Sequence, residues 1–323
     1  MEALETKYMG LELKNPLIVG SCGLTGNVDQ IKKLEEAGAG AVVLKSIFEE
    51  QIMQEAHSLR ETYQHTEEQD YITNYIKGHN LDNYTKLIKE AKKAVDIPVI
   101  ASINCSTPSE WVNYISRIQD HGADAIELNI FMIPGKIEQD GREIEQIYFD
   151  IIRKVRKVAD VPISIKLSNY FSGFANFVSR LSSYEIEGIV LFNRFYKPDI
   201  DIDKMEFVSG SRYSSAAEMS LPLRWIGILA GKVKTDFAAS TGVHNGKAVI
   251  KCILAGANAV QIVSTLYKNG IEEIETILAF ISDWLEHHKY NSIRQITGKL
   301  NQSYIQEPSV YERAQFMKYF HKE

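Results

Sequence analysis

The stretch AGAGAVVLK at residues 37–45 joins the end of a predicted helix to a short strand rich in β-branched residues. The same pattern recurs as HGADAIELN at 121–129, as AGANAVQIV at 255–263 and, more weakly, as EGIVLFN at 187–193. In each copy a glycine follows a helical stretch, where the left-handed backbone that closes a helix favours glycine. These copies predict a chain built from repeated units in which a helix leads into a buried strand.

A second junction, DIPVI at 96–100 and DVPISI at 160–165, also follows amphipathic helices. Proline is tolerated there because its missing N–H donor lies at the margin of a sheet. The two patterns predict strands near 17–21, 41–46, 98–103, 124–129, 161–167, 188–192, 236–240 and 258–263. The predicted helices lie near 27–37, 81–95, 108–120, 141–158, 172–183, 215–233, 245–255 and 270–288.

Strands that are apolar on both faces and alternate with helices indicate a parallel sheet in an α/β protein. Eight such units predict a (β/α)8 TIM barrel. The alternative is an open, doubly wound sheet, which the missing GxGxxG after the first strand disfavours. We expect residues 1–290 to form the barrel and residues 291–323 to form a C-terminal extension that packs on the barrel or on a partner subunit.

Composition restricts the class of protein. The 323 residues carry 36 Lys and Arg against 42 Asp and Glu, a net charge of −6, which argues against nucleic-acid binding through bulk charge. The three cysteines form no CxxC pair, so we expect a reducing compartment. We also expect a cytoplasmic protein outside the membrane, because no apolar run approaches the roughly 20 residues that span a bilayer. The eight histidines show no HExxH spacing, and no metal site is expected.

Active sites of such barrels lie at the carboxyl ends of the strands. Lys45 and Lys166 end otherwise apolar strands, and two cations there favour an electron-rich ligand such as a flavin ring, whose reduced form a cation stabilises. The alternative is a solvated or salt-bridged lysine. Asn129 and Asn193 also end strands and suit imide or amide edges, unless they cap loops.

The segments after the last two strands, STGV at 240–243 and VSTL at 263–266, stand where barrels commonly hold a phosphate. Cys22 and Cys105 end two other strands, and either line the mouth or fill buried space. The long connections over 47–80 and 193–214 fit lids or binding loops.

These residues resemble the dihydroorotate dehydrogenase family, nearest its class 1 members and the related dihydroorotate dehydrogenase-like proteins. The resemblance runs over nearly the whole chain, from GLELKNP at 10–16 to PSVYERA at 308–314. The specific matches are LKS at 44–46, ELN at 127–129, IKL at 165–167, FN at 192–193, QI at 261–262 and LPLRWI at 221–226.

The resemblance implies a barrel that holds FMN without a covalent bond. It assigns Lys45 and Lys166 to the flavin and to catalysis, with Cys105 as a further catalytic candidate. The other cofactor-binding candidates that it implies are Ser21, Ser46, Asn129, Thr241, Gly242, Ser264 and Thr265. The substrate-binding candidates that it implies for a pyrimidine-like small molecule are Asn74, Asn129 and Asn193. Arg194 is a further candidate that departs from the family, which usually has a small hydroxyl residue there, and it either clamps a carboxylate or phosphate or points to solvent. Many class 1 members are homodimers, so we expect a homodimer.

One departure from the family concerns its catalytic base. The family normally has Ser-Cys-Pro-Asn between the asparagine that Asn129 matches and a Pro-Gly-Lys stretch. The cysteine takes a proton from dihydroorotate while a hydride leaves the substrate for the flavin. Here the stretch is NIFMIPGK at 129–136, two residues shorter, with Met132 at the place of the base. A thioether has no proton to exchange and cannot act as a general base. Cys105, His79 or Tyr75 could stand in.

The predicted function is an FMN-dependent oxidoreductase that resembles dihydroorotate dehydrogenase, the enzyme that converts dihydroorotate to orotate in pyrimidine biosynthesis. Two alternatives remain open: a flavin-dependent reductase of another pyrimidine-like or enone substrate, and a flavin-binding protein without turnover. The sequence does not decide among them, and it leaves the electron acceptor open.

Overall fold

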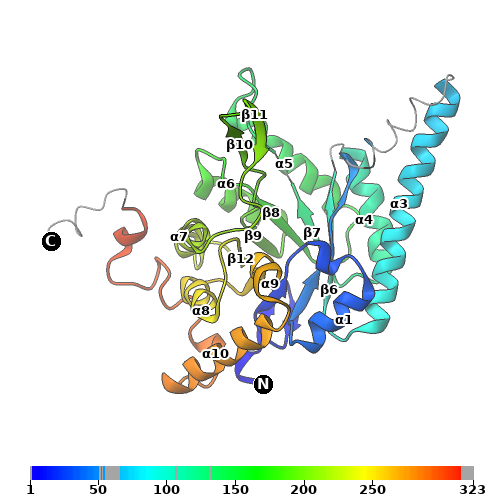
Figure 1. The fold of residues 1–323 in the computed structure, drawn as a ribbon. Helices are drawn as coiled ribbons and strands as arrows, with labels where there is room; N and C mark the ends of the chain where they lie inside the picture. The colour runs from blue at the N-terminus through cyan, green and yellow to red at the C-terminus, as the bar shows by residue number, and fades with distance from the viewer. Residues whose placement is uncertain are drawn as a thin grey trace.

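A computed structural model shows eight parallel strands closed into a ring that helices surround (Figure 1), which confirms the (β/α)8 barrel and excludes the open sheet. The structure describes residues 2–50, 52, 54, 66–105, 108–130 and 132–313, with the backbone alone over 66–77 and 108–110. The barrel strands are β3 (Leu17–Val19), β4 (Ala41–Val43), β6 (Val99–Asn104), β7 (Ala125–Asn129), β8 (Ile163–Leu167), β9 (Gly188–Leu191), β12 (Asp236–Ser240) and β13 (Ala259–Ile262). The pairings β13–β3 and β4–β6 close the ring, and β5 (Ile47–Phe48) pairs with the end of β6.

The helices lie outside this ring. They are α1 (Val28–Glu36), α3 (Thr66–Ala94), α4 (Pro108–Asp120), α5 (Gly141–Arg156), α6 (Phe174–Leu181), α7 (Ser220–Leu229), α8 (Gly246–Ala255), α9 (Ser264–Asn269) and α10 (Glu273–His287). Short 3-10 turns are η1 (Glu2–Leu4), η2 (Gly23–Thr25), η3 (Ser182–Tyr184), η4 (Ala216–Met219), η5 (Ile293–Gln295) and η6 (Pro308–Tyr311). The largest difference from the sequence prediction is α3, which begins at Thr66 rather than near 81. The part of α3 before residue 81 contains Gly78. Glycine lowers helix propensity, so the sequence pattern did not predict a helix there.

Three of the four repeated glycines close a helix, as the sequence pattern predicted. Gly38, Gly122 and Gly256 have φ of 101°, 91° and 118°, the left-handed region that closes a helix. The fourth copy differs, because Glu185 makes the left-handed turn with φ of 57°. Gly188 instead lies inside β9, where a Cβ would sit 2.7 Å from the Met9 side chain. That glycine makes room inside the barrel.

The barrel interior is closed from its amino-terminal end by the hairpin of β1 (Thr6–Tyr8) and β2 (Leu11–Leu13). The Met9 N–H donates to the Asp236 carboxylate at the start of β12. Tyr8 and Met9 are almost completely buried against small interior side chains, namely Ala41, Ala125, Ala238 and Ala259. This packing leaves the opposite end, where the strands finish, as the face for a site.

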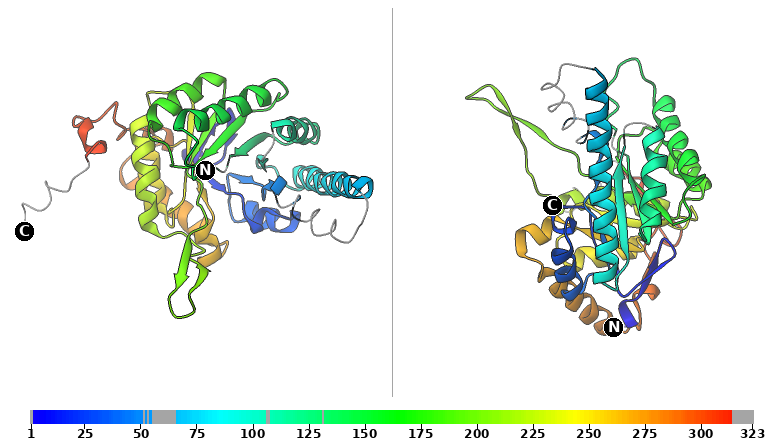
Figure 2. Two further views of the ribbon diagram at one scale, coloured as in Figure 1. Left: turned by 90° about the horizontal axis from the view of Figure 1, so that it is seen from above. Right: turned by 90° about the vertical axis from the view of Figure 1, so that its right-hand side faces the viewer.

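Two segments extend beyond the barrel. The hairpin of β10 (Pro198–Asp201) and β11 (Glu206–Ser209) projects away from the body in both views (Figures 1 and 2). After α10 the chain runs back along α8 and α7, where the Gly298 N–H donates to the Ile253 carbonyl and the Gln302 N–H donates to the Gly227 carbonyl. No helix in the described part of the chain is long and apolar enough to cross a membrane.

Candidate functional site

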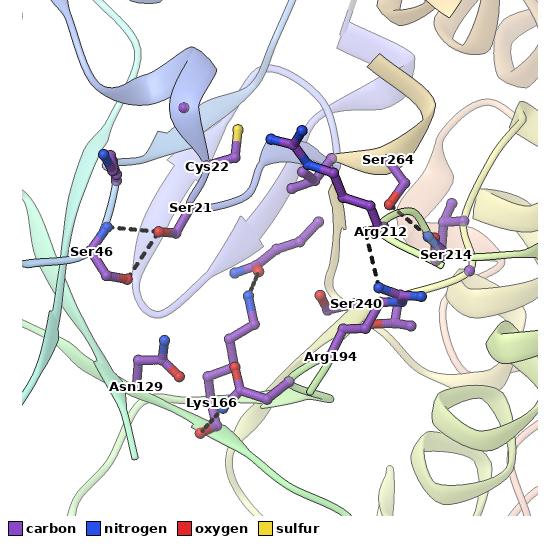
Figure 3. A pocket seen from close by; sticks show the side chains of 18 of the residues that line it. Ser21, Cys22, Ser46, Asn129, Lys166, Arg194, Arg212, Ser214, Ser240 and Ser264 are labelled. Carbon is purple, nitrogen blue, oxygen red and sulfur yellow. Dashed lines mark hydrogen bonds between the residues drawn. The ribbon is translucent and has the colours of Figure 1, made fainter. Parts of the chain in front are cut away.

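A polar cavity of about 470 Å³ opens at the carboxyl ends of the barrel strands (Figure 3). It draws on the connections after β3, β4, β7, β8, β9, β12 and β13, so it is a property of the closed ring rather than of one segment. Its lining residues are Ser21, Cys22, Gly23, Lys45, Ser46, Phe48, Asn129, Lys166, Asn193, Arg194, Arg212, Ser214, Ser240, Thr241, Gly242, Val243, Gln261, Val263 and Ser264.

Hydroxyl groups form one wall of this cavity. The Ser21 and Ser46 hydroxyls lie 2.9 Å apart (Figure 3). The Ser46 hydroxyl also lies 2.7 Å from that of Ser102. The Ser46 N–H also donates to the Ser21 hydroxyl at 2.8 Å. These bonds fix the connections after β3 and β4 against β6. Ser21 and Ser46, both predicted as cofactor-binding residues, therefore lie side by side in a rigid arrangement.

The cavity floor carries a buried cation. The Lys166 Nζ donates to Gln261 Oε1 at 2.7 Å, and Gln261 Nε2 donates to Glu127 Oε2 at 2.5 Å. The Lys166 Nζ also lies 3.6 Å from Glu127 Oε1, and the two side chains are 11% and 1% exposed. Lys45, by contrast, is an exposed residue at the rim. The two predicted lysines thus occupy different electrostatic surroundings, and Lys166 is the one held in a low dielectric.

Two asparagines face the cavity near Lys166. Asn129 is 8% exposed, and its Oδ1 has no hydrogen-bond partner within the described residues. Asn193 is 9% exposed and donates to the Lys166 carbonyl at 3.2 Å. A buried amide oxygen without a partner is costly. The Asn129 oxygen therefore indicates a place for a ligand that donates a hydrogen bond.

The wall below α8 and α9 has the character of an anion site. Thr241 and Gly242 both have φ of 79°, and an added Cβ on Gly242 would overlap the backbone of Met219. The Ser264 hydroxyl accepts from the Ser214 N–H at 3.0 Å, which brings the connection after β9 onto this wall. Arg212 from the same connection lines the cavity (Figure 3).

A histidine stands behind this wall. The His244 Nε2 lies 3.0 Å from the Ser214 hydroxyl. Burial, and then the positive charge of Lys268, lower the pKa of His244 below its ordinary value. Lys268 also donates to the Ser214 carbonyl at 2.8 Å. These groups keep the imidazole neutral at neutral pH and fix Ser214 in place.

Arg194 lines the cavity, but its guanidinium is engaged within the chain. Nε lies 3.1 Å from the Glu218 carboxylate. The terminal nitrogens donate to the carbonyls of Ser211, Arg212 and Tyr213 at 2.7 to 3.1 Å. Charge-assisted bonds of this kind are strong, and Glu218 has a lowered pKa through backbone, Lys197 and Arg194 bonds that outweigh its desolvation. Arg194 therefore stabilises the conformation of the connection after β9.

Acid–base groups are few among the described lining residues, which include no carboxylate and no imidazole. Cys22 is the thiol that lines the cavity, and burial raises its pKa, so it stays protonated at neutral pH. Cys105 is buried at the end of β6 and does not line the cavity. His79 is exposed on α3 and is not among these lining residues. Met132 is half-buried and packs on the hydrophobic core.

Other predicted residues also lie away from the cavity. Thr265 is completely buried, and its hydroxyl donates to the His244 carbonyl, so its side chain does not reach a cofactor there. The prediction placed it with Ser264, but adjacent residues at the start of a helix point in different directions. Asn74 and Tyr75 belong to α3, and their side chains lie outside the described residues.

Sequence reasoning missed several lining residues. Arg212 and Ser214 come from an irregular connection, and only the folded chain brings them to the anion wall. Glu127 and Gln261 did carry a signal, since each is a polar residue inside an apolar strand. Such a residue in a barrel strand must either pair with another polar group or face a site.

The fold is a (β/α)8 barrel, and its polar cavity lies at the carboxyl ends of the strands. Enzymes with this fold carry their active sites at that end. A model of the family described as dihydroorotate dehydrogenase matches residues 3–285. The chain belongs to the dihydroorotate dehydrogenase family, which is flavin-dependent, and it is a dihydroorotate dehydrogenase-like oxidoreductase.

Similar curated proteins cover more than nine-tenths of the chain. The chain is 26% identical over 303 residues to the dihydroorotate dehydrogenase B (NAD(+)) catalytic subunit of Pyrococcus abyssi, covering 91% of this chain and 98% of that protein. It is 27% identical over 307 residues to the protein of the same name from Thermoplasma acidophilum, covering 92% and 99%. For the Shouchella clausii protein of that name, the identity is 24% over 309 residues, covering 92% and 98%.

Proposed function

We propose that this chain is an FMN-dependent oxidoreductase that acts on a CH–CH bond of dihydroorotate or a closely similar pyrimidine. The observation that carries the proposal is the cavity floor, where Lys166 and Asn129 are cross-strand neighbours that both line the cavity and the Asn129 oxygen has no hydrogen-bond partner among the described residues. A cation and a hydrogen-bond acceptor of this kind complement the imide edge of a flavin. When bound, FMN would supply acceptance of a hydride.

The cavity walls fit the rest of that cofactor. Thr241, Gly242, Ser264, Ser214 and Arg212 would hold the phosphate, because they offer backbone N–H groups, hydroxyls and one cation. Ser21, Ser46 and Lys45 would lie along the flavin on the opposite wall. A single anion wall and the absence of a dinucleotide fingerprint favour FMN over FAD or NAD.

Asn129 and Asn193 would orient the substrate ring in this proposal, and Asn74 would join them from α3. Arg194 would act on the substrate only through the connection that it holds, since its donors are engaged. The proton that leaves with the hydride needs an acceptor, and Met132 provides none. We therefore expect slow oxidation of dihydroorotate, because losing a positioned base costs about 10² to 10⁴ in rate.

A second candidate function follows from the acid–base groups of the cavity. The described lining contains a protonated thiol, Cys22, and no carboxylate or imidazole. A protonated thiol can donate a proton, which is what the reduction of an enone or another pyrimidine requires once hydride has been delivered. This arrangement favours a flavin-dependent reductase over an oxidase of the same ring.

The deciding experiment uses the purified protein and its visible spectrum. The proposal expects a flavin spectrum, release of FMN identified by mass spectrometry, and slow anaerobic bleaching by dihydroorotate. Bleaching by a nicotinamide followed by reoxidation by an enone would favour the reductase. A bound flavin that no reductant or substrate bleaches would favour a binding protein without turnover. A dinucleotide, or no flavin after reconstitution, contradicts the proposal.

We further propose that the chain works in the cytoplasm as a homodimer. The relatives are named catalytic subunits, so a second, different subunit that exchanges electrons with this one is the alternative partner. Light scattering of the chain alone distinguishes the two, since a homodimer forms without any other protein.

A further inference from the structure

Three strands bring three polar side chains into contact inside the barrel, directly beneath the cavity. Glu127 comes from β7, Lys166 from β8 and Gln261 from β13. The residues are 1%, 9% and 2% exposed. Lys166 and Gln261 each interrupt a strand whose other residues are apolar or small, and Glu127 lies between two apolar residues of β7. Three polar groups in so buried a place need partners, because burying an unpaired polar group is costly.

The orientation of Gln261 follows from the chemistry of its neighbours. A carboxylate only accepts hydrogen bonds, and an ammonium only donates them. The amide must therefore turn its Nε2 to Glu127 and its Oε1 to Lys166, as the distances of 2.5 Å and 2.7 Å show. Gln261 thus links an anion to a cation and has one orientation that satisfies both.

The pair also balances charge. Lys166 Nζ lies 3.6 Å from Glu127 Oε1, an oxygen with no hydrogen-bond partner within the described residues. Opposite charges at that separation interact strongly when water is excluded. The Lys166 side chain lines the cavity (Figure 3), so the carboxylate compensates part of its positive field and the remainder acts on the cavity.

We propose that Glu127 and Gln261 are positioning residues that hold the Lys166 ammonium at the cavity floor and set how much of its charge a bound cofactor feels. This inference rests on the proposed FMN site. Glu127 reduces the positive field that the Lys166 ammonium exerts on the cavity, whereas Gln261 holds the ammonium close enough to the cavity to reach a ligand. Loss of Glu127 should therefore raise the preference for reduced flavin, and loss of Gln261 should lower it.

The first test measures the reduction potential of the bound flavin in two variants. In Glu127→Gln the full charge of Lys166 faces the cofactor, and the preference for reduced over oxidised FMN should rise about tenfold, or about 30 mV for a two-electron couple. In Gln261→Met the ammonium loses its bonded partner and moves toward the carboxylate, so the preference should fall by a similar factor. Lys166→Ala gives the lower limit.

Ser164→Ala is the matched control. Ser164 is 1% exposed, faces the barrel interior, and lies two residues before Lys166 on the same strand. This variant removes a buried hydroxyl opposite Glu127 on the neighbouring strand and keeps all three groups of the network, so the potential should stay close to that of the wild type. A merely structural role for Glu127 and Gln261 would leave the potential unchanged in both variants or move it the same way. Either result overturns the proposal.

A second test needs no cofactor. Removing Lys166 alone leaves the buried Glu127 uncompensated, so Lys166→Met should lower the melting temperature of the apo-protein markedly. Adding Glu127→Gln to that variant should restore most of the loss, because both charges are then gone. Equal or additive losses in the double variant would show that the two groups do not balance each other.

The two tests separate this inference from the proposed function. If the protein binds no flavin, the proposed function fails, while the thermal cycle still measures the charge pair. If flavin binds and its potential is insensitive to Glu127 and Gln261, the proposed function stands and the positioning role fails.

Discussion

Met132 stands where the family resemblance places a catalytic base, and the structure puts it against the hydrophobic core rather than in the cavity. Its substitution by cysteine should therefore give little gain in dihydroorotate oxidation, no more than a few-fold. Two missing residues remove about 7 Å of extended reach, at roughly 3.3–3.6 Å per residue. Restoring the Ser-Cys-Pro-Asn length by insertion should give the larger gain. Rapid anaerobic flavin bleaching measures both variants.

Fast bleaching by the unchanged protein, at rates comparable to those of the longer variant, would contradict this expectation. It would show that another residue accepts the proton. His79→Ala and Tyr75→Phe would then be the first variants to measure, because the described lining residues include no carboxylate or imidazole.

His244 makes the protein sensitive to acid. Its pKa in the folded state is lowered, mainly by burial and then by Lys268, whereas an unfolded histidine titrates near 6.5. The stabilisation is therefore present above about pH 6.5 and is lost as pH falls through the folded-state pKa. Between pH 7 and pH 5 the melting temperature of His244→Gln should fall less than that of the wild type.

The exposed His287→Gln serves as the control for this pH series, because its ring lies on the surface of α10 far from the anion wall. It should lose as much melting temperature on acidification as the wild type. If His244→Gln loses just as much, the acid sensitivity arises elsewhere.

At the scale of elements, the turn after β12 depends on Gly242. Its φ is 79°, and an added Cβ would overlap the backbone of Met219 at the start of α7. Gly242→Ala should strain this turn by about 1–3 kcal/mol and weaken FMN binding by at least tenfold, measured by fluorescence titration. Gly173→Ala is the matched control, because nothing lies within 4 Å of its added Cβ. Equal affinities in the two variants would exclude this turn from the phosphate site.

The elements that sequence could predict share a local cause. Seven of the eight barrel strands follow a helix or a 3-10 turn, β3 follows the β1–β2 hairpin, and all eight carry an apolar run, so short-range patterns were enough to find them. The β10–β11 hairpin and the early turns of α3 have no such run, and both lay in stretches predicted as loops.

The site residues that could be predicted also share one cause. Residues at strand ends, such as Ser21, Lys166 and Asn129, were predicted because a barrel fixes where strand ends meet. Arg212 and Ser214 could not be predicted, since they reach the cavity through a tertiary hydrogen bond to Ser264. Cys105 shows the limit of the strand-end rule, because the last residue of a strand can point into the core.

At the scale of the whole molecule, the projecting hairpin carries an apolar face. Ile200 and Phe207 are cross-strand neighbours and are 58% and 81% exposed, while Ile202 and Met205 at the tip are 81% and 87% exposed. A lone two-stranded ribbon is marginally stable, and exposed apolar patches of this kind mark interfaces. The other exposed apolar side chains at this end of the barrel, Ile133 and Ile137, offer a counterpart on a second copy.

We therefore expect the double variant Ile200→Ser and Phe207→Ser to convert a homodimer into a monomer, as measured by light scattering across a concentration series. Asp199→Ser changes the opposite face of the ribbon and should leave the mass unchanged. A monomeric wild-type protein, or a double variant that keeps the dimer mass, would contradict the expectation.

Tyr8 and Met9 fill the amino-terminal end of the barrel interior. The packing of the barrel therefore depends on residues near the start of the chain. The barrel-strand residues that pack in the same cluster are alanines, valines and isoleucines, and none of them carries a ring that could fill the space of Tyr8. Tyr8→Ala would leave an empty space at the centre of the molecule. Because unfolding eliminates such voids, the variant should give way at a markedly lower hydrostatic pressure than the intact protein, even where their heat stabilities are close.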